Sequence, residues 1–332
     1  MGLKLIAEIT GLSTATVSHV LNGTRKVSKQ SYEKVIQAAK SVGYRPNIAA
    51  RMLKTKKSST IAIIIPSDIN NQNANYFYMD VIMGARKKAF EAKYELIVST
   101  YDPHSTEDMS LQSAQVLRQH WIDGVVIVPS LLNDVQLGIV RDLEMPFVLL
   151  DRQTDENSPC VASDNKAGVI GAVQLFANCG KRRIGFIGGS ETATGRQRYE
   201  GYLEAIARLG IQREEGIICL NSNYSIQTGM QCALALINAG VDAIFAADNV
   251  MMMGALRSIK SRSLKIPEDI GLIGFDDFEW MENISPPLTT IKQQTFQMGY
   301  IAAEMLIKKL EGTEQNESVI LDTVLVVRSS HG

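Results

Sequence analysis

From residue 60 to the end of the chain, short runs rich in Ile, Val and Leu alternate with segments that have the apolar spacing of amphipathic helices. The strand-like runs are 60–65, 95–100, 124–128, 146–150, 183–187, 243–247, 270–275 and 319–327. Uninterrupted apolar runs of this kind are typical of parallel strands that helices cover on both faces. We therefore expect a doubly wound α/β body, and its length of about 270 residues favours two parallel-sheet lobes over one.

The first 45 residues follow a different pattern, which predicts short helices separated by tight turns. Ser13 and Ser28 are suitable N-caps for the second and third helices. Ala7, Gly11 and Val17 have the spacing that a helix-turn-helix needs, because a small residue lets the helices approach, glycine takes the turn and valine buries the second helix. The sequence thus predicts an all-α head over residues 1–45, joined by a basic segment 46–58 to a body over 59–332.

Charge is strongly segregated along the chain, although the net charge is only -1. Residues 1–60 carry eleven Lys and Arg against two acidic residues, a net charge of +9, while the rest carries -10. Clustered Lys and Arg replace condensed counterions on phosphates, so a basic head indicates a polyanionic partner such as double-stranded DNA. A solvated, charged helix face is the alternative that charge alone leaves open.

Other classes of protein find little support in the sequence. No apolar run has the length of a membrane span, and the first ten residues do not resemble a secretion signal, so we expect a cytoplasmic protein without a membrane partner. Cys160, Cys179, Cys219 and Cys232 are scattered without a C-x-x-C pair, so they are interpreted as reduced core thiols, neither bridged nor bound to zinc. We expect no metal site and no cofactor, and no catalytic motif or nucleophile set predicts an enzyme.

Several ordered motifs closely resemble the lactose/galactose-repressor (LacI/GalR) family of bacterial transcriptional regulators. In the head they are LSTATVSHVLNG at 12–23, GYRPN at 43–47 and AARML at 49–53. In the body they are DR at 151–152, DN at 164–165, RIGFIGG at 183–189, RYEGY at 198–202, IGFDD at 273–277 and PLTTI at 287–291. The resemblance covers essentially the whole chain. The chain departs from the family pattern at His19, where many members have Arg, at Asn249, where relatives usually have Asp, and at 70–74, which resembles an insertion.

For the head, the resemblance implies contacts to DNA. The second helix would enter the major groove, with short side chains that read bases or position phosphates, while a hinge helix would place a leucine in the minor groove. The implied DNA-binding residues are Ser13, Thr14, Ala15, Thr16, Ser18, His19, Asn22, Asn47, Ala50 and Leu53. The residues themselves also allow simpler roles: Ser13 as an N-cap, His19 as a surface residue and Leu53 as a packing residue.

For the body, the resemblance implies a core like that of type I periplasmic binding proteins, with a ligand between the lobes. The N-lobe would span about 59–160 and 292–318 and the C-lobe about 161–291 and 319–332, with crossings near Cys160, Thr290 and Val319. The candidate effector-binding residues follow strands or begin helices, and they are Asp68, Phe77, Tyr78, Arg152, Asp164, Arg198, Asp248 and Asp276. Carboxylates, arginines and aromatic rings suit a sugar or sugar derivative. Loop capping by Asp164 or Asp276, and core packing by Phe77, are the alternatives.

The sequence therefore predicts a homodimeric transcriptional regulator, most simply a repressor, that binds a pseudo-palindromic operator and a small effector. Two-fold symmetry in the protein would match two-fold symmetry in the DNA. A transport-type sugar-binding protein and a sugar-converting enzyme are the alternatives from other classes. The basic head and the missing secretion signal disfavour the first, and the missing catalytic residues disfavour the second.

Overall fold

A computed structural model of the 332-residue chain divides into two compact units, Met1–Ser58 and Ser59–Gly332. The structure describes residues 2–22, 25–44, 57–67, 75–102, 115–118, 121–129, 132, 138–140, 142–143, 145–152, 158–313 and 317–332. Four predicted site residues, Asn47, Ala50, Leu53 and Asp68, lie outside the described residues, as do the side chain of Asn22 and the segment 70–74.

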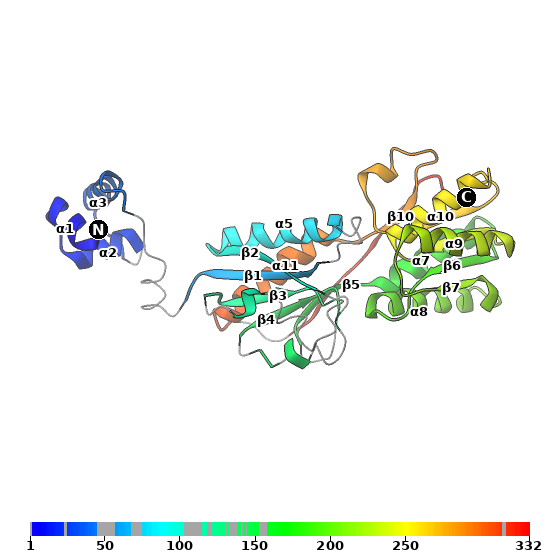
Figure 1. Ribbon diagram of the computed structural model, residues 1–332, viewed down its shortest axis with the longest axis horizontal. Coiled ribbons are helices and arrows are strands. Elements are labelled where there is room, and N and C mark those ends of the chain that lie inside the picture. The colour runs from blue at the N-terminus through cyan, green and yellow to red at the C-terminus, as the bar shows by residue number, and fades with distance from the viewer. Residues whose placement is uncertain are drawn as a thin grey trace. The chain divides into compact units, whose positions relative to one another are not determined.

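The first unit is a three-helix head. Its helices are α1 (Leu3–Thr10), α2 (Thr14–Asn22) and α3 (Lys29–Ser41). Ile6, Val17 and Val35, one from each helix, are fully buried in its core. Gly11 takes the left-handed backbone, with φ at +68°, that the turn between α1 and α2 requires. The predicted helix-turn-helix is therefore confirmed (Figure 1).

The second unit contains two six-stranded sheets. The first sheet contains β1 (Thr60–Pro66), β2 (Glu95–Tyr101), β3 (Gly124–Ile127), β4 (Phe147–Leu150), β5 (Cys160–Ser163) and β11 (Val319–Leu321). The second contains β6 (Ile184–Gly188), β7 (Ile218–Leu220), β8 (Ala243–Ala246), β9 (Gly271–Phe275), β10 (Thr289–Lys292) and β12 (Val324–Val326). All neighbouring strands run parallel except β10 and β12. The predicted pair of parallel-sheet lobes is therefore confirmed.

The two sheets share one strand order and differ in the direction of one edge strand, since β11 runs parallel to β5 but β12 runs antiparallel to β10. Their strand orders are β11-β5-β4-β3-β1-β2 and β12-β10-β9-β8-β6-β7, so each strand of one lobe has an equivalent in the other. In particular, β4 and β9 occupy the same place in the two sheets. Because parallel strands present their carboxyl ends at one edge, residues that follow equivalent strands are the natural candidates for a site between the lobes.

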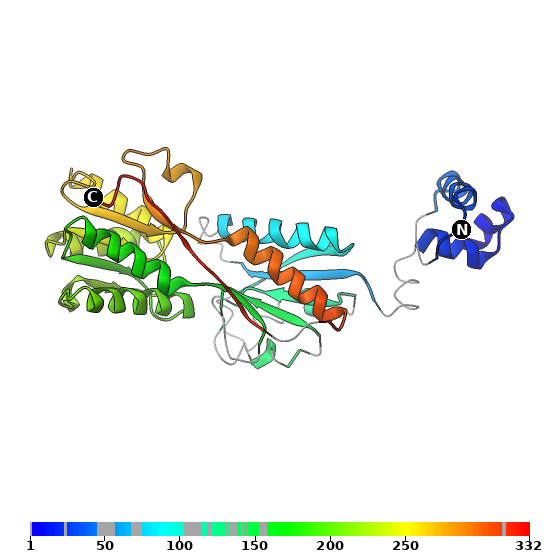
Figure 2. The same cartoon turned by 180° about the vertical axis from the view of Figure 1, so that it is seen from behind.

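Helices cover the sheets. They are α5 (Asn75–Glu91), α7 (Asn165–Asn178), α8 (Ala193–Arg208), α9 (Ile226–Asn238), α10 (Asn249–Ser261) and α11 (Thr295–Leu310), with 3-10 turns η2 (Gln115–Arg118), η3 (Glu215–Ile217) and η4 (Glu279–Met281). In the N-lobe α5 and α11 lie side by side (Figures 1 and 2). Gly84 and Gly299 allow this contact, because a Cβ on either would collide with the backbone of the facing helix. In the C-lobe α7 pairs with α8, and α9 with α10.

The chain crosses between the lobes three times, as the green, orange and red segments in Figure 2 show. Each crossing lies a few residues later than we expected, after Ser163, after Lys292 and between Leu321 and Val324, because β5, β10 and β11 are completed before the chain leaves its sheet. The lobe boundaries at 160, 291 and 318 are corrected accordingly. The run 319–327 was expected to be one strand, but it forms β11 in one sheet and β12 in the other.

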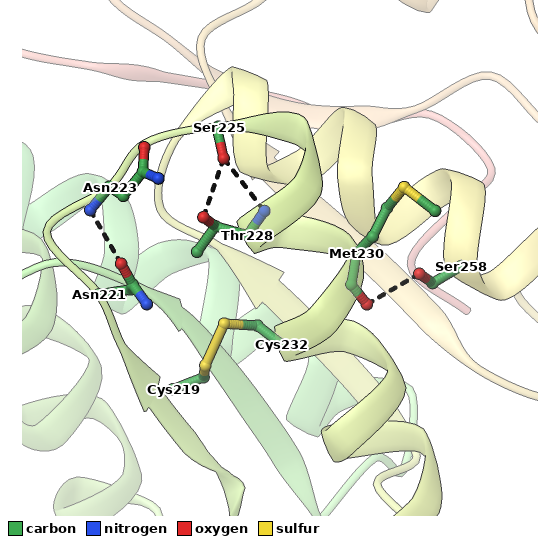
Figure 3. Close-up of a disulfide and its surroundings, with 8 residues drawn as sticks. All are labelled: Cys219, Asn221, Asn223, Ser225, Thr228, Met230, Cys232 and Ser258. Atoms are coloured by element: carbon green, nitrogen blue, oxygen red, sulfur yellow. Dashed lines mark hydrogen bonds between the residues drawn. A yellow bond between two sulfur atoms is a disulfide. The ribbon is translucent and has the colours of Figure 1, made fainter.

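The prediction of four reduced core thiols is wrong for three of the cysteines. Cys219 on β7 and Cys232 on α9 form a disulfide with a Cα–Cα distance of 5.8 Å (Figure 3). Cys179 is exposed, and only Cys160 is a buried free thiol. No sequence motif indicates the bridge, because its two cysteines are separated by 13 positions and come together only when α9 folds back over β7.

Reduction of this disulfide is expected to lower the free energy of unfolding by about 3 kcal/mol, because the bridge restricts the unfolded chain across a loop of this length. The measurement is thermal unfolding with and without dithiothreitol. Cys219→Ser should abolish the response to the reductant, whereas Cys179→Ser should keep it. The denatured, unreduced protein should show two free thiols; four would contradict the bridge.

Candidate functional site

The candidate DNA-binding residues that the structure describes gather at α2. Ser13, Thr14 and Ala15 are exposed where this helix begins, and Ser18 and His19 lie half-buried one turn later. The Ser13 Oγ accepts a hydrogen bond from the Thr16 backbone N–H at 3.1 Å and shares another with the Thr16 hydroxyl at 2.9 Å. Ser13 is therefore an N-cap, and its exposed position also leaves it accessible to a phosphate at the helix N-terminus.

In the body, a buried arginine organises a polar cluster. Arg198 on α8 is only 8% exposed. Its Nε donates to the Asn165 Oδ1 at 2.9 Å, its Nη1 donates to the Ala247 carbonyl at 2.8 Å, and its guanidinium lies 3.6 Å from the centre of the Phe275 ring. A cation held this far from water requires negative charge nearby.

Three aspartates supply that charge, and each follows a strand: Asp151 after β4, Asp248 after β8 and Asp276 after β9. Asp151 and Asp276 stand at equivalent positions of the two sheets, and both have left-handed backbone, with φ at +70° and +69°. Aspartate tolerates this conformation better than most residues. Such strain is concentrated at functional sites, so its repetition in both lobes favours a functional role for the pair.

Burial perturbs two of these carboxyls. Burial raises the pKa of Asp151 to about 7; Arg198 opposes this increase and Asp276 reinforces it. Burial likewise raises the pKa of Asp248 to about 6, although hydrogen bonds from the backbone N–H groups of Met251 and Val250 lower it. Both carboxyls therefore change charge within the physiological pH range.

Two side-chain amides hold the third carboxyl. The Asn249 Nδ2 donates to one oxygen of Asp276 at 3.1 Å, and the Gln293 Nε2 donates to the other at 2.7 Å. Gln293 follows the second crossing, and both Asp276 and Gln293 line a small cavity together with Phe77 of the N-lobe. This cavity therefore has walls from both lobes. We call Asp151, Arg198, Asp248, Asp276 and these two amides the Arg198 cluster.

The structure thus brings together three of the predicted effector residues, Arg198, Asp248 and Asp276, and places Phe77 against the same cavity. Three others have different surroundings. They are Tyr78, which packs against the N-lobe core, Arg152, which donates to the carbonyls of Pro129 and Leu132, and Asp164, which caps α7 through the Ala167 N–H at 2.9 Å. For Asp164, the structure agrees with the capping alternative.

Sequence reasoning missed four members or partners of the cluster, Asp151, Asn165, Asn249 and Gln293. It also missed Tyr224, whose hydroxyl lies 3.5 Å from the Thr192 hydroxyl. Burial raises the pKa of Tyr224, and the charge of Arg198 lowers it. Tyr224 follows β7, so the rule that sites follow strands could have found it had that strand been predicted. Among the amides, Asn249 is noted only as a departure from the family pattern and Asn165 only as part of the DN motif at 164–165, whereas Gln293 carries no signal.

Among the described residues, no group of three or more His, Cys, Asp and Glu side chains is arranged to hold a metal ion. In the same part of the chain, no helix is both long and apolar enough to span a membrane.

Comparison with known proteins gives matches to both units. Residues 2–47 match the family described as bacterial regulatory proteins, lacI family, and residues 173–331 match the periplasmic binding protein-like domain. The transcriptional regulator RegA of Clostridium saccharobutylicum is 33% identical over 99% of this chain and 98% of its own length. CelR of Thermobifida fusca is 30% identical over 99% of this chain and 97% of its own length.

Solved structures agree with this. A lac repressor dimer bound to operator and the anti-inducer ONPF matches with a TM-score of 0.85 at 25% identity. The match covers 100% of this chain and 99% of that one. A complex of the regulator CelR with cellobiose has a TM-score of 0.75 at 28% identity, with 99% of both chains covered.

Proposed function

Because the chain belongs to the LacI family of bacterial regulatory proteins and is a DNA-binding transcriptional regulator, not an enzyme, we propose that it is an effector-controlled repressor. It acts in the cytoplasm as a homodimer on a pseudo-palindromic operator, and a small, sugar-like molecule modulates its affinity. The observation that carries the proposal is that one chain combines a basic helix-turn-helix head with a two-lobed body that buries Arg198, Asn249, Asp276 and Gln293.

In this proposal α2 reads the major groove. Thr14 and Ala15 contact base edges, His19 reaches bases one turn later, and Ser13 and Thr16 position phosphates. The exposure of Ser13, Thr14 and Ala15 at the start of α2 supports this assignment. The hinge residues Asn47, Ala50 and Leu53 complete the interface through the minor groove, an assignment that is carried by their sequence motif alone.

Effector control follows from linkage between the two sites. The Arg198 cluster and its cavity draw residues from both lobes, so a bound molecule would stabilise one arrangement of the lobes over another. If operator binding favours a different arrangement, each ligand changes the affinity of the other by the same factor. An effector that saturates the protein without changing operator affinity would contradict this mechanism.

The homodimer has support in an apolar stripe along α5. Met79, Met83 and Phe90 are exposed, Phe90 to 82%, and their spacing of four and seven residues puts them on one helix face. Exposed apolar patches of this kind mark protein interfaces. Met83→Glu is therefore expected to raise the dimer dissociation constant by on the order of a hundredfold, because the charge would be buried without a partner. Sedimentation equilibrium measures this constant.

Ile320→Glu is the matched control. Ile320 is 50% exposed on β11, which lies at the opposite edge of the first sheet from β2. The same introduction of charge should leave the dimer intact there. Equal dissociation constants for Met83→Glu and the unchanged protein would exclude the α5 stripe as the interface.

Selection from a random duplex library tests the proposed function itself. The purified full-length protein should enrich a sequence made of two related, inverted half-sites. Failure to enrich any duplex, with and without a panel of sugars, would contradict the function. Enrichment of a single half-site would support a DNA-binding regulator but contradict binding as a dimer to a two-fold operator.

A further inference from the structure

The Arg198 cluster contains an excess of hydrogen-bond acceptors. Within the part of the chain that the structure describes, three buried side-chain atoms lack a hydrogen-bond partner, and all three are oxygens: Asp151 Oδ1, Asn249 Oδ1 and Gln293 Oε1. Buried polar atoms are normally paired, and each unpaired one costs free energy. Their common chemistry and their common location indicate a ligand that brings donors.

The orientation of the two amides follows from Asp276. The oxygens of a carboxylate accept hydrogen bonds, so Asn249 and Gln293 turn their amide nitrogens towards Asp276. Their amide oxygens then point away from Asp276 and have no hydrogen-bond partner. Both residues are more than nine-tenths buried, at 4% and 5% exposure. The leftover oxygens therefore lie within one amide group of Asp276, away from solvent that could satisfy them.

The charge of the cluster is unbalanced in the same direction. When ionised, Asp151, Asp248 and Asp276 carry three negative charges, and Arg198 supplies one positive charge. Two of the guanidinium's N–H donors are already committed to Asn165 and Ala247. The cluster therefore holds more carboxylates than cations. Burial is the main cause of the raised pKa values of Asp151 and Asp248, and the charge of Asp276 adds to it.

The surrounding charges do not correct the imbalance. Among described residues, Lys292 and Asp80 line the cavity as exposed residues of opposite charge, Asp277 is paired with Arg328 at 2.6 Å, and Glu191 near Tyr224 is acidic. Arg152, which directly follows Asp151, donates to backbone carbonyls of its own lobe.

We propose that the effector is a cation: a small molecule that carries a protonated primary amine together with hydroxyl groups, the chemistry of an amino sugar. This inference rests on the proposed function and specifies the ligand of its effector site. An ammonium group brings three donors and one of the two missing positive charges, and the hydroxyls satisfy the remaining oxygens. A phosphate or carboxylate ligand would add acceptors and negative charge to a cluster that already has both in excess.

Matched hexose derivatives test the proposal. The full-length protein is titrated at pH 7.5 with glucosamine, galactosamine and mannosamine, with the parent hexoses, and with the hexose 6-phosphates, and thermal unfolding reports binding because a ligand that binds the folded state raises the midpoint. At least one amine should raise the midpoint more than its neutral parent, and the phosphates should have no effect. A larger effect from a neutral hexose or a phosphate, or no effect from all three amines, overturns the proposal.

A pair of substitutions identifies the site. Asp248→Asn removes one charge of the cluster but keeps a good N-cap for α10, so it should weaken the amine's affinity by about tenfold to a hundredfold and weaken the affinity of a neutral hexose much less. Asp242→Asn makes the same change at the opposite end of β8, where Asp242 accepts hydrogen bonds from the backbone N–H groups of Arg182 and Arg183. Equal losses in the two variants would overturn the assignment to the Arg198 cluster.

The operator assay separates this inference from the proposed function. If the protein binds its selected duplex and a neutral or anionic metabolite changes the affinity for that duplex, the proposed function is supported and the cationic effector is contradicted. If the protein binds an amine but no duplex, the cationic ligand is supported and the proposed function is contradicted.

Discussion

Raising the salt concentration from 50 to 200 mM is expected to weaken operator binding by about 10³- to 10⁵-fold, because a helix-turn-helix dimer makes roughly 6 to 10 phosphate contacts. The physical reason is the release of counterions that Lys and Arg replace on DNA. Residues 1–60 hold a net charge of +9 per chain, enough for contacts of this number in a dimer. Fluorescence anisotropy with a labelled duplex at several salt concentrations gives the slope directly.

The effector provides the internal control for this experiment. Its site lies in a body with a net charge of -10 and involves no polyanion, so its affinity should change far less over the same salt range. A slope near zero in the plot of log DNA affinity against log salt concentration would show that the basic head is a solvated surface, the alternative that charge alone left open. A slope shared by effector and DNA would indicate a general loss of the folded protein.

The elements that could be predicted are those with a strong local signal. Long apolar runs such as 60–65 and 270–275 became β1 and β9 because a buried parallel strand needs apolar residues on both faces. β7 was missed because its three residues are half-buried or exposed and so have no such run. The run 319–327 is continuous in sequence, and only the packing of two separate sheets divides it at Asp322 and Thr323.

The candidate site shows the same limit. Asp248 and Asp276 could be predicted because they follow strands, and the edge where strands end is where ligands bind. Of the neighbours Asp151 and Arg152, sequence reasoning chose the arginine, but Asp151, which has left-handed backbone, is the one that joins the cluster. Gln293 is an unremarkable amide in the sequence; its role depends on meeting Asp276 across 17 positions of the chain.

Arg198→Met is expected to lower the free energy of unfolding by about 3 to 5 kcal/mol at pH 8, because removing one partner of a buried charge cluster leaves the others uncompensated. Methionine retains an aliphatic stem that can pack on Phe275 but supplies no charge or donor. Chemical denaturation measures the loss. Arg208→Met, on the same helix, is the matched control: Arg208 is a largely exposed partner of Glu204, so little change is expected there.

The pH dependence distinguishes lost charge compensation from lost packing. Burial raises the pKa of Asp151 to about 7 and that of Asp248 to about 6, from an ordinary value of 3.8. Between pH 3.8 and these raised pKa values, the folded state therefore binds more protons than the unfolded state. Their ionisation therefore destabilises the folded protein as pH rises through this window, and protonation removes the penalty as pH falls. The deficit of Arg198→Met should accordingly be largest at pH 8 and shrink towards pH 5.

Adding Asp151→Asn to Arg198→Met should restore part of the stability at pH 8, because asparagine removes a buried charge and also tolerates the left-handed backbone at this position. The double variant should also lose much of its pH dependence between 5 and 8. If Arg198→Met loses the same stability at pH 5 and pH 8, and Asp151→Asn restores none of it, then the guanidinium acts through packing and its hydrogen bonds to Asn165 and Ala247, and the carboxylates contribute no electrostatic coupling.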